Sequence, residues 1–338
     1  MKKLCLLLII TLAMFSDRSL GANKDLPLRL LQTIPLPNLK SGDFDHFAVD
    51  FEHNRLFLTA EENNAVEVFD LRTNKRIHTI RDVDTPHSLL YLADSNQLLV
   101  INGGDGAVKF FDVTTYDVIA TVNVSLGADS SVYEPARHLL YIACGGEDAK
   151  MDSSLISIID TSTRKHVGDI KVDSTNIEGM AIELNGPRLF VNIRDRSLIG
   201  VVDRERRTVI ATWPLGGVKG NTPIALDEAN HRLFVAGRKP ATFLVLDTDS
   251  GKIVSSLPTA EITDDMLFDS ESKRIYIACS DFAVVYAQVD ADHYKELGRA
   301  PTGFRGKTAI LVSPLQRYYV AVPRHGNKLA GVRVYQVQ

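Results

Sequence analysis

The sequence predicts an all-β fold, a seven-bladed β-propeller of four-stranded antiparallel blades whose ring is closed by an N-terminal strand in the last blade. Three observations lead to this prediction. One unit of short strands recurs seven times, and the spacing between successive units is 42 to 49 residues. The strands are rich in β-branched and aromatic residues, and turns separate them about every ten residues. A period in the low forties is typical of propeller blades, whereas helical repeats of that length would need longer apolar segments.

Each repeat can be aligned on an anchor, the first apolar residue of its second strand, as in RLFLTA at 55–60. The strand before the anchor usually ends in a carboxylate six residues upstream, such as Asp50 or Glu183. The strand after the anchor ends in Asp in most repeats, and an amphipathic outer strand follows it. Each repeat therefore supplies strands A, B, C and D of one blade. The anchors are Leu56, Leu98, Leu140, Leu189, Leu233, Ile275 and Tyr318.

Aspartates close strand C in five repeats and begin polar turns such as DLRTNK and DTSTRK. Because they recur at one place in the repeat, we expect them to cap turns by accepting backbone N–H bonds and not to act in catalysis. They are Asp70, Asp112, Asp160, Asp203 and Asp247. The same comparison assigns Glu61, Glu62 and Glu67 of the first repeat to blade wall and turn.

Residues 1–22 differ in kind from the rest. Lys2 and Lys3 precede an apolar run, Leu4–Phe15, and a short polar stretch, Ser16–Ala22, follows it and ends in the small residues Gly21 and Ala22. This is the layout of a secretory signal peptide, and the run is short for a membrane span; an uncleaved anchor is the alternative. We expect cleavage after Ala22, export to the periplasm or the medium, and a monomeric mature chain without a membrane span.

The seventh repeat ends at Gln338 without room for an outer strand. Leu28–Leu36, LRLLQTIPL, is similar to the outer strands of the other repeats and is expected to complete blade seven beside the C-terminal strand. Closing the ring in this way removes free sheet edges. Residues 23–338 are therefore expected to form one propeller domain.

Two further features concern loops and cysteines. Cys144 and Cys279 end equivalent strands three repeats apart, so the blades that carry them are not neighbours. A disulfide needs close Cα atoms, and two free buried thiols are expected instead. The third repeat carries an insertion, Gly145–Ser154, that either serves function or merely extends a hairpin.

Three repeats have the form LFLTAEENNAVEVFDLRTNKRI, LFVNIRDRSLIGVVDRERRTVI and LFVAGRKPATFLVLDTDSGKIV. In these segments the chain resembles the YVTN-repeat β-propellers, the YncE-like proteins, over residues 28–338, with LFLT, LYIA and LFVN as looser forms of the family tetrad. WD40 repeats are disfavoured because Trp213 is the only Trp and no WD dipeptide occurs. The resemblance implies an exported seven-bladed propeller with a binding role, and single-stranded DNA binding for some members.

Propeller function usually lies at the mouth of the central channel, where strand A of each blade begins. Counting eleven residues back from the anchors gives Asp45, His87, Asp129, Glu178, Thr222, Asp264 and Lys307. The next residues are His46, Ser88, Ser130, Gly179, Pro223, Asp265 and Thr308, and Asn221 precedes the fifth pair. The charged residues of these two sets are predicted to form an acidic ligand site together with His46, His87 and Asn221. The alternative is that these groups only hydrate a water-filled channel and cap strand starts.

Carboxylates facing one another across a channel raise each other's pKa or recruit a cation. Their oxygens, with Asn and His, suit Ca²⁺, Mg²⁺ or Zn²⁺, so a divalent cation is the cofactor that the sequence suggests. Glu178, Asn221 and Asp264 resemble the metal site of SMP-30/gluconolactonase-type propellers, which implies a lactonase or hydrolase using metal-bound water. His46 and His87 offer metal ligands, acid–base groups or hydrogen bonds to a neighbouring blade's backbone.

The leading functional prediction is a non-catalytic binding or scaffold protein whose ligand is an unidentified small molecule or protein. The alternatives are the metal-dependent hydrolase and a single-stranded nucleic-acid binder. The net charge of −4, with 42 acidic against 38 basic residues, argues against nucleic acid. Basic residues near the loops that follow strand B or begin strand A offer a local basic rim; they are Arg194, Arg196, Arg238, Lys239 and Arg305.

Overall fold

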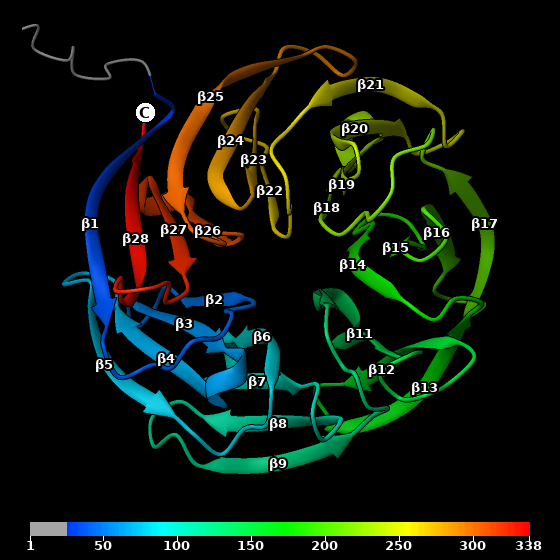
Figure 1. The fold of residues 1–338 in the computed structure, drawn as a ribbon. Helices are drawn as coiled ribbons and strands as arrows, with labels where there is room; N and C mark the ends of the chain where they lie inside the picture. The colour runs from blue at the N-terminus through cyan, green and yellow to red at the C-terminus, as the bar shows by residue number, and fades with distance from the viewer. Residues whose placement is uncertain (1–25) are drawn as a thin grey trace, which may run out of the picture.

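A computed structural model describes residues 26–338, so the expected signal peptide at 1–22 lies outside the described residues. Residues 26–338 form seven four-stranded antiparallel sheets arranged as blades around a common axis (Figure 1). The predicted seven-bladed all-β propeller is confirmed. Among the described residues, no helix has the length and apolarity needed to cross a bilayer.

The first three blades follow one another in chain order. Blade one contains β2 (Phe47–Asp50), β3 (Arg55–Ala60), β4 (Ala65–Asp70) and β5 (Lys75–Ile80). Blade two contains β6 (Pro86–Leu92), β7 (Gln97–Asn102), β8 (Ala107–Asp112) and β9 (Val118–Asn123). Blade three contains β10 (Ser131–Glu134), β11 (Leu139–Gly145), β12 (Ser154–Asp160) and β13 (Lys165–Val172).

The next three blades repeat this order. Blade four contains β14 (Ile177–Ile182), β15 (Arg188–Ile193), β16 (Leu198–Asp203) and β17 (Thr208–Pro214). Blade five contains β18 (Ile224–Asp227), β19 (Arg232–Arg238), β20 (Ala241–Asp247) and β21 (Ile253–Pro258). Blade six contains β22 (Met266–Asp269), β23 (Arg274–Ala278), β24 (Asp281–Gln288) and β25 (Tyr294–Gly303).

Blade seven joins the two ends of the described chain. It contains β26 (Thr308–Val312), β27 (Arg317–Val322), β28 (Ala330–Val337) and, as its outer strand, β1 (Leu28–Leu36). The pairing runs antiparallel from Leu28 opposite Val337 to Leu36 opposite Ala330. The predicted closure of the ring by the N-terminal strand is confirmed.

Short 3-10 turns join strands within five of the blades. They are η1 (Glu61–Asn63), η2 (Ala93–Ser95), η3 (Pro135–Arg137), η4 (Glu228–Asn230) and η5 (Ser313–Leu315). Each is followed by a residue in the left-handed conformation, such as Asn64 or His231. Four of these turns join strands A and B, whereas η1 joins strands B and C of blade one and therefore lies at the opposite end of its blade.

The core lies between neighbouring blades. Strands B and C are covered on both faces, so their apolar runs are continuous; Leu56, Phe57 and Leu58 of β3 are all fully buried. The outer strands instead alternate between exposed and half-buried positions, as in β17. Successive side chains of a strand point to opposite faces. A strand covered on both faces is therefore buried throughout, whereas a strand covered on one face is buried only at every second position.

The turn aspartates behave as predicted. Asp70 accepts backbone N–H bonds from Arg72 and Thr73, at 3.1 and 2.7 Å. Asp112, Asp160, Asp203 and Asp247 bond the equivalent turns in their own blades. Cys144 and Cys279 are both buried and free, as expected.

Candidate functional site at the channel mouth

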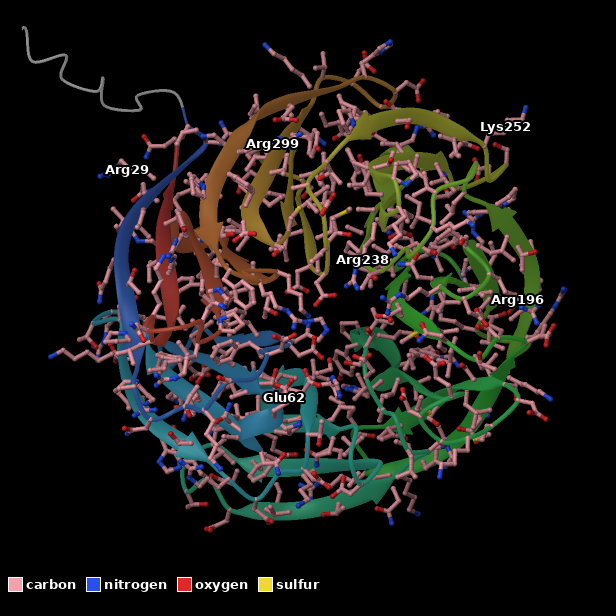
Figure 2. All side chains as sticks on the ribbon, in the orientation of Figure 1. Arg29, Glu62, Arg196, Arg238, Lys252 and Arg299 are labelled. Carbon is pink, nitrogen blue, oxygen red and sulfur yellow. The ribbon has the colours of Figure 1, made fainter. Side chains whose placement is uncertain are left out.

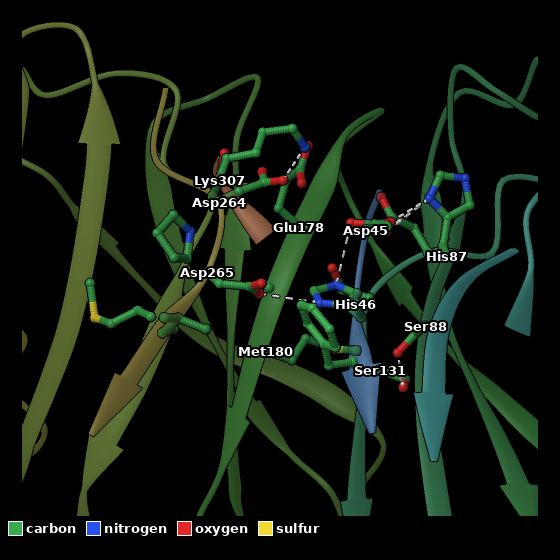
Figure 3. A pocket seen from close by; sticks show the side chains of 18 of the residues that line it. Asp45, His46, His87, Ser88, Ser131, Glu178, Met180, Asp264, Asp265 and Lys307 are labelled. Atoms are coloured by element: carbon green, nitrogen blue, oxygen red, sulfur yellow. Dashed lines mark hydrogen bonds and ion pairs between the residues drawn. The ribbon is translucent and has the colours of Figure 1, made fainter. Parts of the chain in front are cut away.

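A polar cavity of about 400 Å³ lies where strand A of each blade begins, and we call it the mouth cavity (Figure 3). Every residue of the two predicted register sets except Thr308 lines it. Thr308 is buried and donates its hydroxyl to the carbonyl of Phe44 at 2.8 Å. The regular repeat places one strand start per blade around the axis, which is why counting back from the anchors located the cavity.

Asn221 does not line the mouth cavity, which corrects the prediction for this residue. Its side chain is fully buried, and Nδ2 donates to Asn192 Oδ1 at 2.7 Å and to the Leu198 carbonyl at 3.1 Å. Asn192 donates in turn to the Thr222 carbonyl at 2.7 Å. The amide therefore ties the start of blade five to blade four instead of facing the axis.

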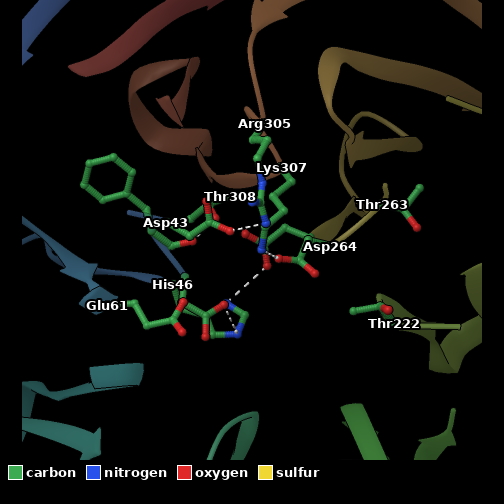
Figure 4. Close-up of polar contacts among 12 residues, drawn as sticks. Asp43, His46, Glu61, Thr222, Thr263, Asp264, Arg305, Lys307 and Thr308 are labelled. Atoms are coloured by element: carbon green, nitrogen blue, oxygen red, sulfur yellow. Dashed lines mark hydrogen bonds and ion pairs between the residues drawn. The ribbon is translucent and has the colours of Figure 1, made fainter. Parts of the chain in front are cut away.

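The remaining members of the expected metal set are held by basic residues. Asp264 accepts a 2.8 Å hydrogen bond from Arg238 and pairs with Lys307 (Figure 4). Glu178 pairs with Arg194. The structure therefore does not bring Glu178, Asn221 and Asp264 together as ligands of one ion.

His87 stands against Asp45 in the mouth cavity. Its Nδ1 lies 2.6 Å from Asp45 Oδ2, and its Nε2 lies 3.9 Å from Glu61 Oε1. Burial works against the charged ring, but the hydrogen bond and charge of Asp45 raise the pKa of His87 to about 9. A Cβ at Gly103 would come within 2.6 Å of the His87 ring, so this glycine leaves the space that the imidazole occupies.

His46 lies between two carboxylates. Its Nδ1 is 3.2 Å from Asp265 Oδ1, and its Nε2 is 3.7 Å from Asp45 Oδ1. Asp265 is itself fixed, because its Oδ2 accepts the Ala309 N–H at 2.7 Å. Although burial opposes it, the charges of Asp45 and Asp265 hold the pKa of His46 well above its usual value.

Hydrogen bonds from the two imidazoles to a neighbouring blade's backbone were one expectation, and the structure shows carboxylate contacts in their place. The backbone tie comes instead from Thr59. Its hydroxyl accepts the His46 N–H at 2.9 Å and donates to the His87 carbonyl at 3.1 Å. This buried hydroxyl fixes the spacing of the first two blades at the cavity.

Four carboxyl groups of the cavity, those of Glu61, Asp129, Glu178 and Asp265, are harder to ionise than usual. Burial is the largest cause in each case, and it raises the pKa of Asp129 to about 6 and those of Glu61 and Glu178 to about 7. The neighbouring charge of Asp45 adds to the effect on Asp129, as that of Asp129 does for Glu178. These groups gain most from a cation that enters the cavity.

Three charged lining residues were missed, or assigned differently, from the sequence. Glu61, which was assigned to blade wall and turn, lines the cavity together with Arg194 and Arg238. All three lie five residues after an anchor, where strand B ends. Strand B runs antiparallel to strand A, so its end meets the start of strand A at the same side of the ring; counting forward by five would have found them.

The expected basic rim is divided by the structure. Arg238 points toward the axis, whereas Arg196 lies at the periphery, where it pairs with Asp173 at 2.9 Å (Figure 2). Arg305 pairs with Asp43, and neither residue lines the cavity (Figure 4). The basic residues that reach the cavity are therefore already paired with carboxylates.

The blade-three insertion borders the site. Glu147 and Asp148 of the insertion line a side pocket of about 220 Å³ that shares Asp129, Glu178 and Arg194 with the mouth cavity. Asn176 Nδ2 donates to Glu147 Oε1 at 2.9 Å and holds the insertion against blade four.

Comparison with known proteins supports the fold. No family model matches the chain. Antigen Lp49 of Leptospira interrogans serogroup Icterohaemorrhagiae serovar copenhageni (strain Fiocruz L1-130) is 21% identical over 243 residues, a match that covers 68% of this chain. The chain spans about half of that protein's length, 51%.

Two solved structures resemble the whole propeller. The hydrazine synthase of Kuenenia stuttgartiensis aligns with a TM-score of 0.75 at 16% identity, over 89% of this chain and 97% of that one. A chain of a mitotic checkpoint complex aligns with a TM-score of 0.75 at 13% identity, over 98% of this chain and 99% of that one. These likenesses show the fold alone.

Proposed function

We propose that this chain is an exported, YVTN-type propeller that acts as a monomeric binding protein and takes a small cationic ligand in the mouth cavity. The observation that carries the proposal is the pair of carboxylates Glu61 and Asp129. Both line the cavity, and within residues 26–338 neither side chain accepts a hydrogen bond; their nearest basic atoms are those of His87, 3.9 and 3.7 Å away.

The charge balance of the lining favours a cation. Six carboxyl groups of the described chain line the cavity against three permanently charged side chains, Arg194, Arg238 and Lys307. Each of these three is paired with Glu178 or Asp264. His46 and His87, whose pKa values are raised, face Asp45 and Asp265, so the lining carboxyl groups left without a hydrogen-bonded partner are Glu61 and Asp129. These two groups favour a cation and disfavour phosphates, and hence single-stranded nucleic acid.

The size of the cavity limits the ligand. About 400 Å³ suits a hydrated metal ion or a small organic ammonium compound. Lactone hydrolysis gains no support from Glu178, Asn221 and Asp264, because the first and third are held by cations and the second is buried elsewhere. Export itself rests on the sequence of residues 1–22, and fractionation of cells expressing the full chain tests it.

Isothermal titration calorimetry of the purified chain tests the binding function. The probes are Zn²⁺, Ca²⁺ and spermidine, with inorganic phosphate and a single-stranded oligonucleotide as anionic probes. We expect at least one cation to bind, and its affinity to fall more than tenfold in the Glu61→Gln/Asp129→Asn double variant. Glu271→Gln, at an exposed turn far from the cavity lining, is the matched control. Binding of the anionic probes alone, or equal cation affinity in the double variant, would overturn the proposal.

A further inference from the structure

We propose that the ligand is a divalent transition-metal ion held by Asp45, His46 and Asp129; this inference rests on the cation-binding function proposed above. One ligand atom from each of these side chains lies within 4.8 Å of the other two. Asp45 and His46 precede β2 in blade one, and Asp129 precedes β10 in blade three, so the three donors approach the axis from two sides. Figure 3 shows Asp45 and His46 beside each other in the cavity.

The geometry leaves one free donor atom on each of the first two residues. Asp45 uses Oδ2 to accept from His87 Nδ1 at 2.6 Å, and its Oδ1 faces His46 Nε2 at 3.7 Å. His46 uses Nδ1 to contact Asp265 Oδ1 at 3.2 Å. The two atoms without a hydrogen bond, Asp45 Oδ1 and His46 Nε2, therefore face each other in the cavity.

The groups behind these donors resemble the outer sphere of a metal site. A metal-binding histidine usually donates its second ring nitrogen to a carboxylate, which fixes the orientation of the ring and the nitrogen that meets the metal. Asp265 takes this position behind His46, and the Ala309 N–H fixes Asp265 at 2.7 Å. His87 fixes Asp45 in the same way. This support comes from outside the three ligands, from blades two, six and seven.

A second group, Asp45, Glu61 and His87, also has its donor atoms within 4.8 Å of one another. There, however, His87 Nδ1 and Asp45 Oδ2 are already bonded to each other at 2.6 Å. A metal in that group would have to replace this bond or use His87 Nε2 with Glu61. The first group keeps the bond and uses it, so we assign the ion to Asp45, His46 and Asp129.

The donor set selects the class of ion. One imidazole nitrogen and two carboxylates match Zn²⁺ and neighbouring transition metals, which accept mixed nitrogen and oxygen ligands. Ca²⁺ takes six to eight oxygens and Mg²⁺ keeps a shell of waters and carboxylates. Around a tetrahedral Zn²⁺ with bonds of about 2.0–2.2 Å, ligand atoms lie about 3.4 Å apart, so the three donors, now within 4.8 Å of one another, need only short inward shifts to meet one ion.

Metal titration of the chelator-treated full chain tests this assignment, with Zn²⁺ as ligand and Co²⁺ as a spectroscopic probe. We expect one Zn²⁺ per chain, bound at least tenfold more tightly than Ca²⁺. His46→Ala and Asp129→Asn should abolish stoichiometric Zn²⁺ and the visible Co²⁺ bands. Asp265→Asn, which acts through His46, should weaken Zn²⁺ about 10- to 100-fold and shift the Co²⁺ bands.

Two comparisons make the result decisive. Glu178→Gln tests the metal set that the sequence suggested, Glu178, Asn221 and Asp264. A larger loss of Zn²⁺ in this variant than in Asp129→Asn would overturn the assignment. Melting temperatures of the metal-free variants show whether each one is folded, and the Co²⁺ spectrum of Asp265→Asn reports the ligands in a variant that retains all three. If spermidine or Ca²⁺ binds and depends on Glu61 and Asp129 while Zn²⁺ does not bind, the metal assignment is wrong and the cation-binding function stands. If no cation binds, both are wrong.

Discussion

Gly103 illustrates how a residue without a side chain can determine the chemistry of the mouth cavity. A Cβ at this position would lie 2.6 Å from Cδ2 and 2.7 Å from Nε2 of His87. Gly103 lies five residues after the anchor Leu98, the register position that brings Glu61, Arg194 and Arg238 to the cavity in other blades. In blade two the end of strand B therefore makes room for the histidine instead of adding a charge.

Gly103→Ala is expected to push the imidazole away from Asp45. The pKa of His87 should then fall from about 9 toward its usual value of 6.5, because the hydrogen bond and charge of Asp45 are what raise it. Histidine side-chain NMR during a pH titration measures this change. Gly200→Ala is the control, since an added Cβ there meets Val191 and Ile193 in blade four and should cost stability without moving the His87 titration. An unchanged His87 pKa in Gly103→Ala would contradict this account.

Glu61 is expected to make the stability of the protein depend on pH. Burial raises its pKa from 4.5 to about 7 in the fold, so the fold favours the protonated form. Protonated Glu61 makes its full contribution to stability below pH 4.5, which is the pKa of this group in the unfolded chain. The contribution is lost as the pH rises through about 7, its pKa in the folded protein.

Glu61→Gln should therefore stabilise the protein at pH 8 by about 1–2 kcal/mol, allowing for partial solvation of the side chain, and leave it unchanged near pH 4. Urea unfolding at the two pH values measures the difference, with Glu271→Gln as control. A loss of stability at pH 8, or equal changes at both pH values, would show that the charge of Glu61 is well compensated.

In blades one, four and five, the arginine that precedes the anchor joins its blade to the next. Arg55 donates to the Val113 carbonyl, Arg188 to that of Thr248, and Arg232 to that of Ala291. Each acceptor follows strand C of the next blade, and each arginine also meets a carboxylate at the end of strand A or C in its own blade. In blades one and four the carboxylate six residues before the anchor, Asp50 or Glu183, is therefore part of a tie between blades.

Arg188→Ala is expected to lower the free energy of unfolding by about 2–4 kcal/mol, because it leaves the buried Glu183 carboxylate and the Thr248 carbonyl without their partner. Denaturant unfolding measures the loss. Arg206→Ala removes an arginine that is 78% exposed and pairs with Asp203 in the same turn, so it should cost less than about 0.5 kcal/mol. Similar losses in the two variants would refute the tie between blades.

The period of the repeat explains what the sequence could and could not predict about the site. The start of strand A follows the period, so Asp45, His87 and Glu178 were placed at the cavity by counting. Asn221 lies one residue before the counted position of its blade, Thr222, and the period does not give the direction of a side chain there. Its amide turns to Asn192 in the neighbouring blade. The pairing of Asp264 with Arg238 depends on two blades meeting at the axis, which no local pattern encodes.

Around the whole ring, the seam between β1 and β28 is the one place in the described chain where distant parts of the sequence share a blade. Leu36 of β1 is fully buried in the cluster that joins blades seven and one, whereas Leu30 on the same strand is 48% exposed. In a closed ring every blade packs against two neighbours, and opening the seam removes that support from blades one and seven first. The packing of blades one and seven against their neighbours therefore depends on this seam.

Trp213, the only tryptophan, can report whether opening the seam affects the far side of the ring. It lies in β17 of blade four, across the ring from β1 (Figure 1). Leu36→Ala should lower the free energy of unfolding by about 2–5 kcal/mol, as expected for truncating a buried leucine. If the ring unfolds as one cooperative unit, Trp213 fluorescence and far-UV circular dichroism should shift to lower denaturant together in this variant. Leu30→Ala should shift neither signal. A circular dichroism transition that moves while the Trp213 transition stays in place would instead show that blades seven and one open locally and that the seam does not hold the far side of the ring.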